Sequence, residues 1–246
     1  MSLVLFKSLI SKNKYVESLF RSLHSHVPIH LKLKLSRKFV TAYSDLENDN
    51  KVIFVHVPKA AGNGITQSLF SLPSTGHYFL QKYKEDDYDK FCNYKKFTVV
   101  RNPWDRFVSA FHYLHSDKGG MGVWDNDFKD NFLKGIPDFK SFINHMIHDE
   151  KFKRDVLAWT HFIPQSYFLT LPSDNSLQNF DCICRFENLN ADFESLKKIL
   201  GKPEAQLAVI NKSKHQHYKD YYTEQYMIDF ISEIYKDDIL LLGYEF

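Results

Sequence analysis

Short runs of apolar residues are the clearest structural signal in this sequence. Residues 52–57 and 97–100 are nearly continuous apolar runs, and residues 180–185 give a third, more mixed one. Runs of this length are typical of strands that are buried on both faces of a sheet. Apolar residues at helical spacing follow, so strands and helices alternate along the chain. We therefore predict an α/β fold in three layers, with a central, mostly parallel sheet flanked by helices.

The helix after the second run has the clearest start signal. Asn102 is placed to cap it, Pro103 stands at its first position, and Asp105 lies near the positive end of its dipole. Another helix is predicted from Asn63 onward. Three more are expected over residues 139–148, from a cap at Asn190 to Gly201, and after a cap at Thr223. Irregular segments are expected at the polar residues 44–51 and at the Gly-, Asp- and Asn-rich residues 116–137.

The length of the chain, 246 residues, allows one sizeable core. We expect residues 1–50 to form an N-terminal helical extension and residues 51–246 to form the main domain. The extension is basic and amphipathic, which fits either a helix packed on the domain or one lying on a membrane surface. Its first apolar run is too short to cross a bilayer and lacks a signal-peptide cleavage site. We therefore expect a cytoplasmic protein with, at most, peripheral membrane contact.

Composition argues against some classes of partner. The formal net charge is +2, so no global positive field favours nucleic acid. The three cysteines have no framework spacing, which suits a reducing compartment. Cys182 and Cys184 are expected to point to opposite faces of a strand, and this argues against a zinc site.

The first strand leads into a segment suited to binding an anion. Residues 53–64 read Ile-Phe-Val-His-Val-Pro-Lys-Ala-Ala-Gly-Asn-Gly, a strand followed by a glycine-containing turn and a helix start. Free N–H groups at a helix N-terminus favour phosphate or sulfate, and Lys59 adds a full charge. A nucleotide triphosphatase loop would need Lys and Ser or Thr directly after its last glycine. Here Lys59 precedes Gly62, so that class is disfavoured.

The second strand leads into a similar corner. Arg101 stands where the strand ends and can hold a phosphate with its planar guanidinium. Ser109, two helical turns later, can donate its hydroxyl to the same group. Arg106 lies on another side of the helix, so we expect it to be structural.

Together the two corners resemble a known family. His56-Val57-Pro58-Lys59-x-x-Gly62 is similar to the 5′-phosphosulfate loop of the Golgi-type carbohydrate sulfotransferases and their bacterial relatives, sulfotransferase family 2. Residues 100–111 resemble the family's 3′-phosphate segment, and the likeness extends over about residues 51–246. It implies a P-loop-like fold and 3′-phosphoadenosine 5′-phosphosulfate (PAPS) as sulfuryl donor, leaving adenosine 3′,5′-bisphosphate. Asn63-Gly64 departs from the Thr-Ser that the family often has, which removes a hydroxyl contact to the 5′-phosphate.

The resemblance also implies roles for individual residues. Lys59 would stabilise the leaving phosphate, with no metal required. His77 would be the base, because Gly76-His77 matches a Gly-His pair in the heparan-type relatives; His112 and His115 are fallback candidates, and His56 is expected to be structural. The residues expected to hold the donor are Lys59, Ala60, Ala61, Gly62, Asn63, Gly64, Arg101 and Ser109.

The expected acceptor is a carbohydrate hydroxyl, since aromatic rings stack on sugars and polar side chains bind their hydroxyls. Candidates for this surface are Trp159, His161 and Gln165, with Trp124, Tyr218, Tyr221 and Tyr222; each of them could equally be a core or surface residue. The basic residues 212–219 could close over the nucleotide, meet an anionic glycan, or form a solvated face. Two other functions stay open: a non-catalytic anion- or glycan-binding module and a P-loop-type kinase.

Overall fold

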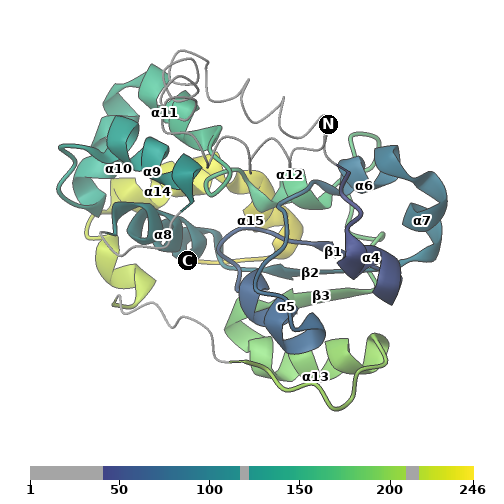
Figure 1. Cartoon of the computed structure of the whole chain (residues 1–246). Helices are drawn as coiled ribbons and strands as arrows, with labels where there is room; N and C mark the ends of the chain where they lie inside the picture. The colour runs from purple at the N-terminus through teal and green to yellow at the C-terminus, as the bar shows by residue number, and fades with distance from the viewer. Residues whose placement is uncertain (1–40, 117–121, 209–215) are drawn as a thin grey trace. The chain divides into compact units, whose positions relative to one another are not determined.

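Within the described residues, a parallel sheet of three strands lies at the centre of the fold (Figure 1). The structure is a computed structural model that describes residues 41–116, 122–208 and 216–246. Its strands are β1 (Val52–Val55), β2 (Lys95–Val100) and β3 (Cys182–Arg185), in the order β1-β2-β3. Both strand pairs are parallel, so the predicted parallel sheet is confirmed. The described chain from Tyr43 onward belongs to one compact unit.

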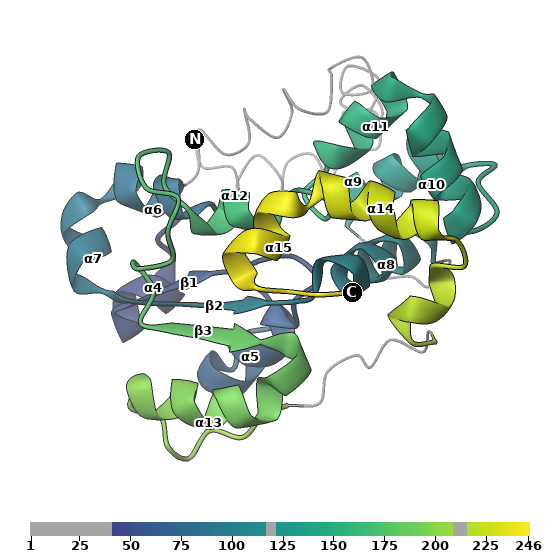
Figure 2. The same cartoon turned by 180° about the vertical axis from the view of Figure 1, so that it is seen from behind.

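Helices cover both faces of this sheet. In Figures 1 and 2, α5 and α13 lie on one side of the strands, and α12 and α15 on the other, which gives the three predicted layers. A further group, α8 to α11 with α14, lies beyond the carboxyl ends of the strands. The helices are α4 (Asp45–Asn50), α5 (Gly62–Phe70), α6 (Leu80–Asp86), α7 (Tyr88–Asn93), α8 (Pro103–His115), α9 (Val123–Phe128), the π-helix η1 (Lys129–Leu133), α10 (Phe139–His148), α11 (Glu150–Leu157), α12 (Gln165–Leu169), the 3₁₀-helix η2 (Phe186–Asn188), α13 (Leu189–Ile199), the 3₁₀-helix η3 (Tyr218–Tyr221), α14 (Gln225–Ile234) and α15 (Lys236–Leu242).

Some expectations lie beyond what the structure describes. None of the helices in the described ranges is long and apolar enough to cross a membrane. The amphipathic N-terminal segment and residues 212–215 of the basic loop lie outside the described residues. Their proposed contacts, and the division at residue 50, stay predictions.

The register of the sheet sets where the two motifs meet. Phe54 on β1 is paired with Phe97 on β2, and their buried rings stack with centroids 4.7 Å apart. Burying a side chain of this size contributes roughly 1.5–3 kcal/mol. The Thr98 hydroxyl, itself buried, donates to the Val55 carbonyl over 2.8 Å. This pairing brings the carboxyl ends of β1 and β2, and the loops that follow them, to one edge of the sheet.

The expectation of a loop at residues 44–51 was wrong, because Asp45–Asn50 form the helix α4. Ser44 and Glu47 make a capping box, in which the Ser44 backbone N–H donates to the Glu47 carboxylate over 2.8 Å. A serine followed three residues later by glutamate is a known start signal for a helix. The polar composition of the segment concealed that signal.

Other boundaries also differ from the sequence-based prediction. Part of the stretch expected to be irregular forms α9 and the following π-helix. Helix α13 begins after Asn188 rather than Asn190, and α14 after Glu224 rather than Thr223. By contrast, the predicted cap at Asn102 is confirmed, because its side-chain oxygen accepts from the N–H groups of Trp104 and Asp105.

The two cysteines of β3 lie on the same side of the strand, so the expectation of opposite faces was wrong. Residues two apart in a strand point to the same face, and the Cys182 and Cys184 sulfur atoms are 3.8 Å apart. Across the described ranges, no group of three or more His, Cys, Asp or Glu residues is placed to hold a metal ion.

A buried carboxylate joins α12 to α15. Asp238 is fully buried, and its two oxygens accept from the N–H groups of Gln165 and Ser166, each over 2.7 Å. These N–H groups belong to the first turn of α12, which has no helical partner for them. Asp238 therefore holds α12, and with it Gln165, in a fixed place beside the sheet.

We expect Asp238→Ala to lower the free energy of unfolding by about 2–5 kcal/mol, because two buried N–H groups lose a charged acceptor. Urea denaturation measures the change. Asp237→Ala is the matched control, since Asp237 is exposed and surface changes of this kind stay within about 0.5 kcal/mol. Equal stability of the two variants would contradict the role given to Asp238.

Candidate active site

The loop between β1 and α5 has an unusual backbone conformation. Lys59 and Ala61 have φ angles of 67° and 68°, in the left-handed region that residues with a Cβ avoid. Such residues cost on the order of 1–3 kcal/mol each and cluster at functional sites. The turn ends at Gly62, the first residue of α5; the N–H groups of Gly64 and Ile65 donate to the Ala61 carbonyl, and those of Gly62 and Asn63 have no acceptor within the helix. This end of α5 is therefore suited to an anion.

Gly62 is needed because the His56 ring lies against it. A Cβ placed on Gly62 would lie 2.1 Å from two ring atoms of His56. The ring is buried, stacks on Phe54 with centroids 5.2 Å apart, and pairs through Nδ1 with the Thr75 hydroxyl over 3.0 Å. Burial lowers the pKa of His56 well below its usual value. These contacts fit the structural role expected for His56.

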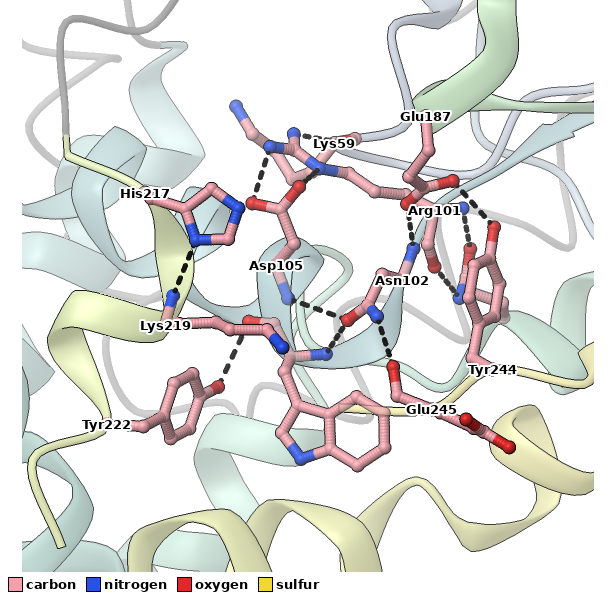
Figure 3. A network of polar contacts seen from close by, with 12 residues as sticks. Lys59, Arg101, Asn102, Asp105, Glu187, His217, Lys219, Tyr222, Tyr244 and Glu245 are labelled. Atoms are coloured by element: carbon pink, nitrogen blue, oxygen red, sulfur yellow. Dashed lines mark hydrogen bonds and ion pairs between the residues drawn. The ribbon is translucent and has the colours of Figure 1, made fainter.

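Arg101 connects the two corners (Figure 3). Its Nε and Nη2 donate to the two oxygens of Asp105, each over 2.8 Å, and its Nη1 donates to the Lys59 carbonyl over 3.0 Å. The guanidinium also lies 4.0 Å from the centre of the Phe186 ring. Since an arginine has five N–H groups, these bonds leave one N–H on each terminal nitrogen. Ser109 is buried on the same helix, one turn beyond Asp105.

The backbone at Arg101 and Asn102 is held from behind. The Gln165 amide accepts from the Arg101 N–H over 2.9 Å and donates to its carbonyl over 2.7 Å. Glu187 accepts from the Asn102 N–H over 2.6 Å and from the Tyr244 hydroxyl over 3.0 Å (Figure 3). Gln165 is fully buried, so the structure places it behind the site and not on a surface facing an acceptor.

The Lys59 side chain lies over an aromatic ring. Its Nζ is 3.7 Å from the centre of the Tyr113 ring. The Tyr113 hydroxyl in turn donates to Asp125 over 2.9 Å. Burial, and next the charge of Arg101, lower the pKa of Lys59 to about 8, against the opposing charge of Asp125. Lys59 is therefore a cation near neutral pH and readily attracts an anion.

His77 lies close to the loop, as the sequence suggested. Its Nδ1 is 2.9 Å from the His56 carbonyl. Because a carbonyl can only accept, Nδ1 carries the proton and Nε2 keeps the lone pair in the neutral ring. Burial, and next His161, lower the pKa of His77 to about 4. The ring is thus neutral at pH 7 and has a nitrogen that can accept a proton.

His161 and Asp125 complete the cluster. The His161 Nε2 donates to Asp125 over 3.1 Å, and its ring centre is 6.2 Å from that of His77 and 5.1 Å from that of Tyr113. Tyr113 and Asp125 were not foreseen from the sequence. The sequence did contain a signal for Tyr113, because it stands one helical turn after Ser109 on α8. It contained no such signal for Asp125, which lies in the stretch expected to be irregular.

The remaining candidates lie around this cluster or outside it. Arg106 is structural as predicted: it is buried and donates to the carbonyls of His161 and Ile163 over 3.0 and 2.7 Å. Trp159 is buried, stacks on Phe128, and lies close enough to Asp125 to help lower the pKa of that carboxyl. Three others contact neighbours outside the cluster: His112 lies against Tyr221, His115 pairs with the Ile136 carbonyl, and the Tyr222 hydroxyl donates to the Trp104 carbonyl. The ring of Tyr218 packs against Phe246, whereas Trp124, on α9 next to Asp125, is exposed.

Comparison with known proteins gives two matches. The model of a family described as the sulfotransferase family matches residues 44–245, most of the chain. Human carbohydrate sulfotransferase 9 is 25% identical over an alignment of 209 residues, and the match covers 73% of this chain and 44% of that protein. The chain thus spans less than half the length of this curated relative. No solved structure matches the chain.

We expect Gly62→Ala to lower the free energy of unfolding by about 1–3 kcal/mol, because the new methyl group would overlap the His56 ring. Thermal and urea denaturation measure this. Gly64→Ala is the matched control: its Cβ would meet only the Ala208 carbonyl, at 3.6 Å, and alanine favours a helix by up to about 1 kcal/mol. A Gly62→Ala protein as stable as the control would rule out the close contact.

Proposed function

This chain belongs to the sulfotransferase family, as its two motifs predicted, and we propose that it transfers a sulfuryl group from PAPS to a carbohydrate hydroxyl. The observation that carries this proposal is the hydrogen bond from Arg101 to the Lys59 carbonyl. It joins two cationic strand-to-helix corners that are 42 residues apart in the sequence. One ligand with anionic groups at both ends can bind both corners at once.

The residues present fit such a ligand. Lys59 and the N–H groups at the start of α5 are suited to the 5′ end. Arg101 has two N–H groups left for the 3′-phosphate, and Ser109 lies one turn beyond its partner Asp105. Asn63, exposed at the start of α5, is the residue available where the family often has a hydroxyl.

In the proposed reaction the acceptor oxygen forms a bond to sulfur while the bond from sulfur to the 5′-phosphate oxygen breaks. The hydroxyl proton passes to Nε2 of His77, the nitrogen with the lone pair. The Lys59 ammonium neutralises the charge that builds up on the departing phosphate. A positioned base contributes typically about 10²–10⁴-fold to rate, and one well-placed donor about 10²–10³-fold.

A carbohydrate acceptor is supported by the name of the curated relative and by the surface near Asp125. Trp124, the residue directly before Asp125 on α9, is 41% exposed and can stack on a sugar ring. The three acceptor residues foreseen from the sequence are all buried: His161 lies in the cluster, Trp159 lies beside it near Asp125, and Gln165 lies behind Arg101.

The test is transfer of ³⁵S from labelled PAPS to a panel of unsulfated polysaccharides, together with thermal shift. We expect label in at least one polysaccharide, and stabilisation by adenosine 3′,5′-bisphosphate but not by ATP with magnesium. Binding of the bisphosphate without any transfer would favour a non-catalytic module. Stabilisation by ATP with magnesium alone would favour a kinase.

Two substitutions separate binding from chemistry. His77→Ala should reduce transfer by about 10²-fold or more, the scale of a lost base, while calorimetry shows nearly unchanged bisphosphate affinity. Arg101→Ala should weaken bisphosphate binding by at least about 10-fold, because a charge-assisted contact to phosphate is lost. Near-normal turnover of His77→Ala would remove His77 from the role of base.

The pH profile should be bell-shaped in kcat/KM. His77 accepts a proton only when neutral, so activity rises as pH passes its pKa of about 4. Lys59 stabilises the leaving group only when charged, so activity falls above its pKa of about 8. Lys59→Arg should move the alkaline limb upward by more than about two pH units, since arginine stays charged to about pH 12. An alkaline limb that does not move would assign it to another group.

A further inference from the structure

The Asp125 carboxylate connects two rings of the site. One of its oxygens accepts from the Tyr113 hydroxyl over 2.9 Å, and the other accepts from Nε2 of His161 over 3.1 Å. The side chain is only 16% exposed. Although burial acts in the opposite direction, the bonds from His161 and Tyr113 hold the pKa of Asp125 below its usual value. Asp125 is therefore a fixed negative charge with both oxygens engaged.

Through Tyr113 this carboxylate acts on Lys59. The Tyr113 ring is held at its hydroxyl end by Asp125 and has the Lys59 ammonium 3.7 Å from its centre. A cation over a ring gains about 0.5–2 kcal/mol. The long lysine side chain thus has a defined position before any ligand arrives. Less conformational entropy is therefore lost when a ligand binds to it.

Through His161 the carboxylate fixes a proton. Since a carboxylate only accepts, Nε2 carries the hydrogen and Nδ1 has the lone pair. Nδ1 is buried and has no hydrogen-bond partner among the described residues. A hydrogen on Nδ1 would be a buried donor without an acceptor, at a cost of about 1–3 kcal/mol. One neutral tautomer of His161 is therefore favoured beside His77.

We propose that Asp125 is the positioning residue of this site, which holds Lys59 in place through Tyr113 and keeps His161 in its Nε2–H tautomer beside His77. The proposal rests on the proposed function for its effect on catalysis. The arrangement itself can be tested on the free protein. Asp125 touches neither Lys59 nor His77, the two residues to which the proposed reaction assigns a role. Its effect therefore passes through the rings of Tyr113 and His161.

The first test is ¹⁵N NMR of the full chain without ligand. Histidine ring spectra should show His161 with hydrogen on Nε2 only, and a spectrum with hydrogen on Nδ1 would overturn the proposal. A titration of the Lys59 side chain should show a lower pKa in Asp125→Asn than in the wild type. Asp130→Asn is the matched control, because it removes the same charge from an exposed position in the next turn. The groups that act on Lys59 besides Asp125 are Arg101, Tyr113, His56, His77 and His161.

The second test measures transfer to whichever panel polysaccharide the wild type labels, at about pH 6.5, where Lys59 is charged in both proteins. Asp125→Asn should lower kcat about 10-fold or more with KM for PAPS changed less than about threefold, since positioning acts on the chemical step. Asp125→Glu, which keeps the charge, should recover part of kcat. Wild-type kcat in Asp125→Asn, or a Lys59 pKa no lower than in Asp130→Asn, would overturn the proposal.

The two proposals fail in different ways. A wild type that labels no acceptor and does not bind adenosine 3′,5′-bisphosphate would refute the sulfotransferase reaction, while the NMR results would still decide the role of Asp125. Active wild type with an unaltered Asp125→Asn would refute only the positioning role. Circular dichroism of each variant establishes that it is folded.

Discussion

The hydrogen bond from the Arg101 guanidinium to the Lys59 carbonyl is the contact on which the site depends. Each corner alone is a strand-to-helix turn with one cation at the strand end. Joined over 3.0 Å, they become one surface with a cation at each end. The sheet makes this contact possible, because the parallel pairing of β1 and β2 brings the ends of both strands to the same edge.

The Arg101–Asp105 ion pair is better explained by positioning than by stability. Both residues are mostly buried, and removing two charges from water costs several kcal/mol per ion, which their attraction offsets only in part. What the pair supplies is orientation. Two bonds to Asp105 and one to Lys59 fix the guanidinium plane, while Gln165 fixes the backbone beneath it. Two N–H groups of the guanidinium take no part in these bonds.

Two cations and three histidines share a small volume, and this crowding decides their protonation. Burial and mutual repulsion hold His56, His77 and His161 in their neutral forms, and they lower the pKa of Lys59 as well. The Asp125 carboxylate opposes the loss of charge on Lys59. The same burial therefore leaves a neutral His77 and a charged Lys59 in one cluster, the two states that the proposed reaction needs.

Features that depend on neighbouring residues could be read from the sequence alone. The strand runs, the Asn102 cap, and the placement of Lys59 before Gly62 and of Arg101 at a strand end follow from local spacing and sufficed for the fold class, while the resemblance of the two motifs pointed to the family. The sequence also contained the Ser44–Glu47 capping box, which its polar surroundings concealed. Only the tertiary structure decided that Gln165 is buried behind Arg101, and that Asp125 joins Tyr113 to His161. Those contacts link residues 12 to 64 positions apart, and no local pattern encodes a hydrogen bond that forms only when separate elements pack together.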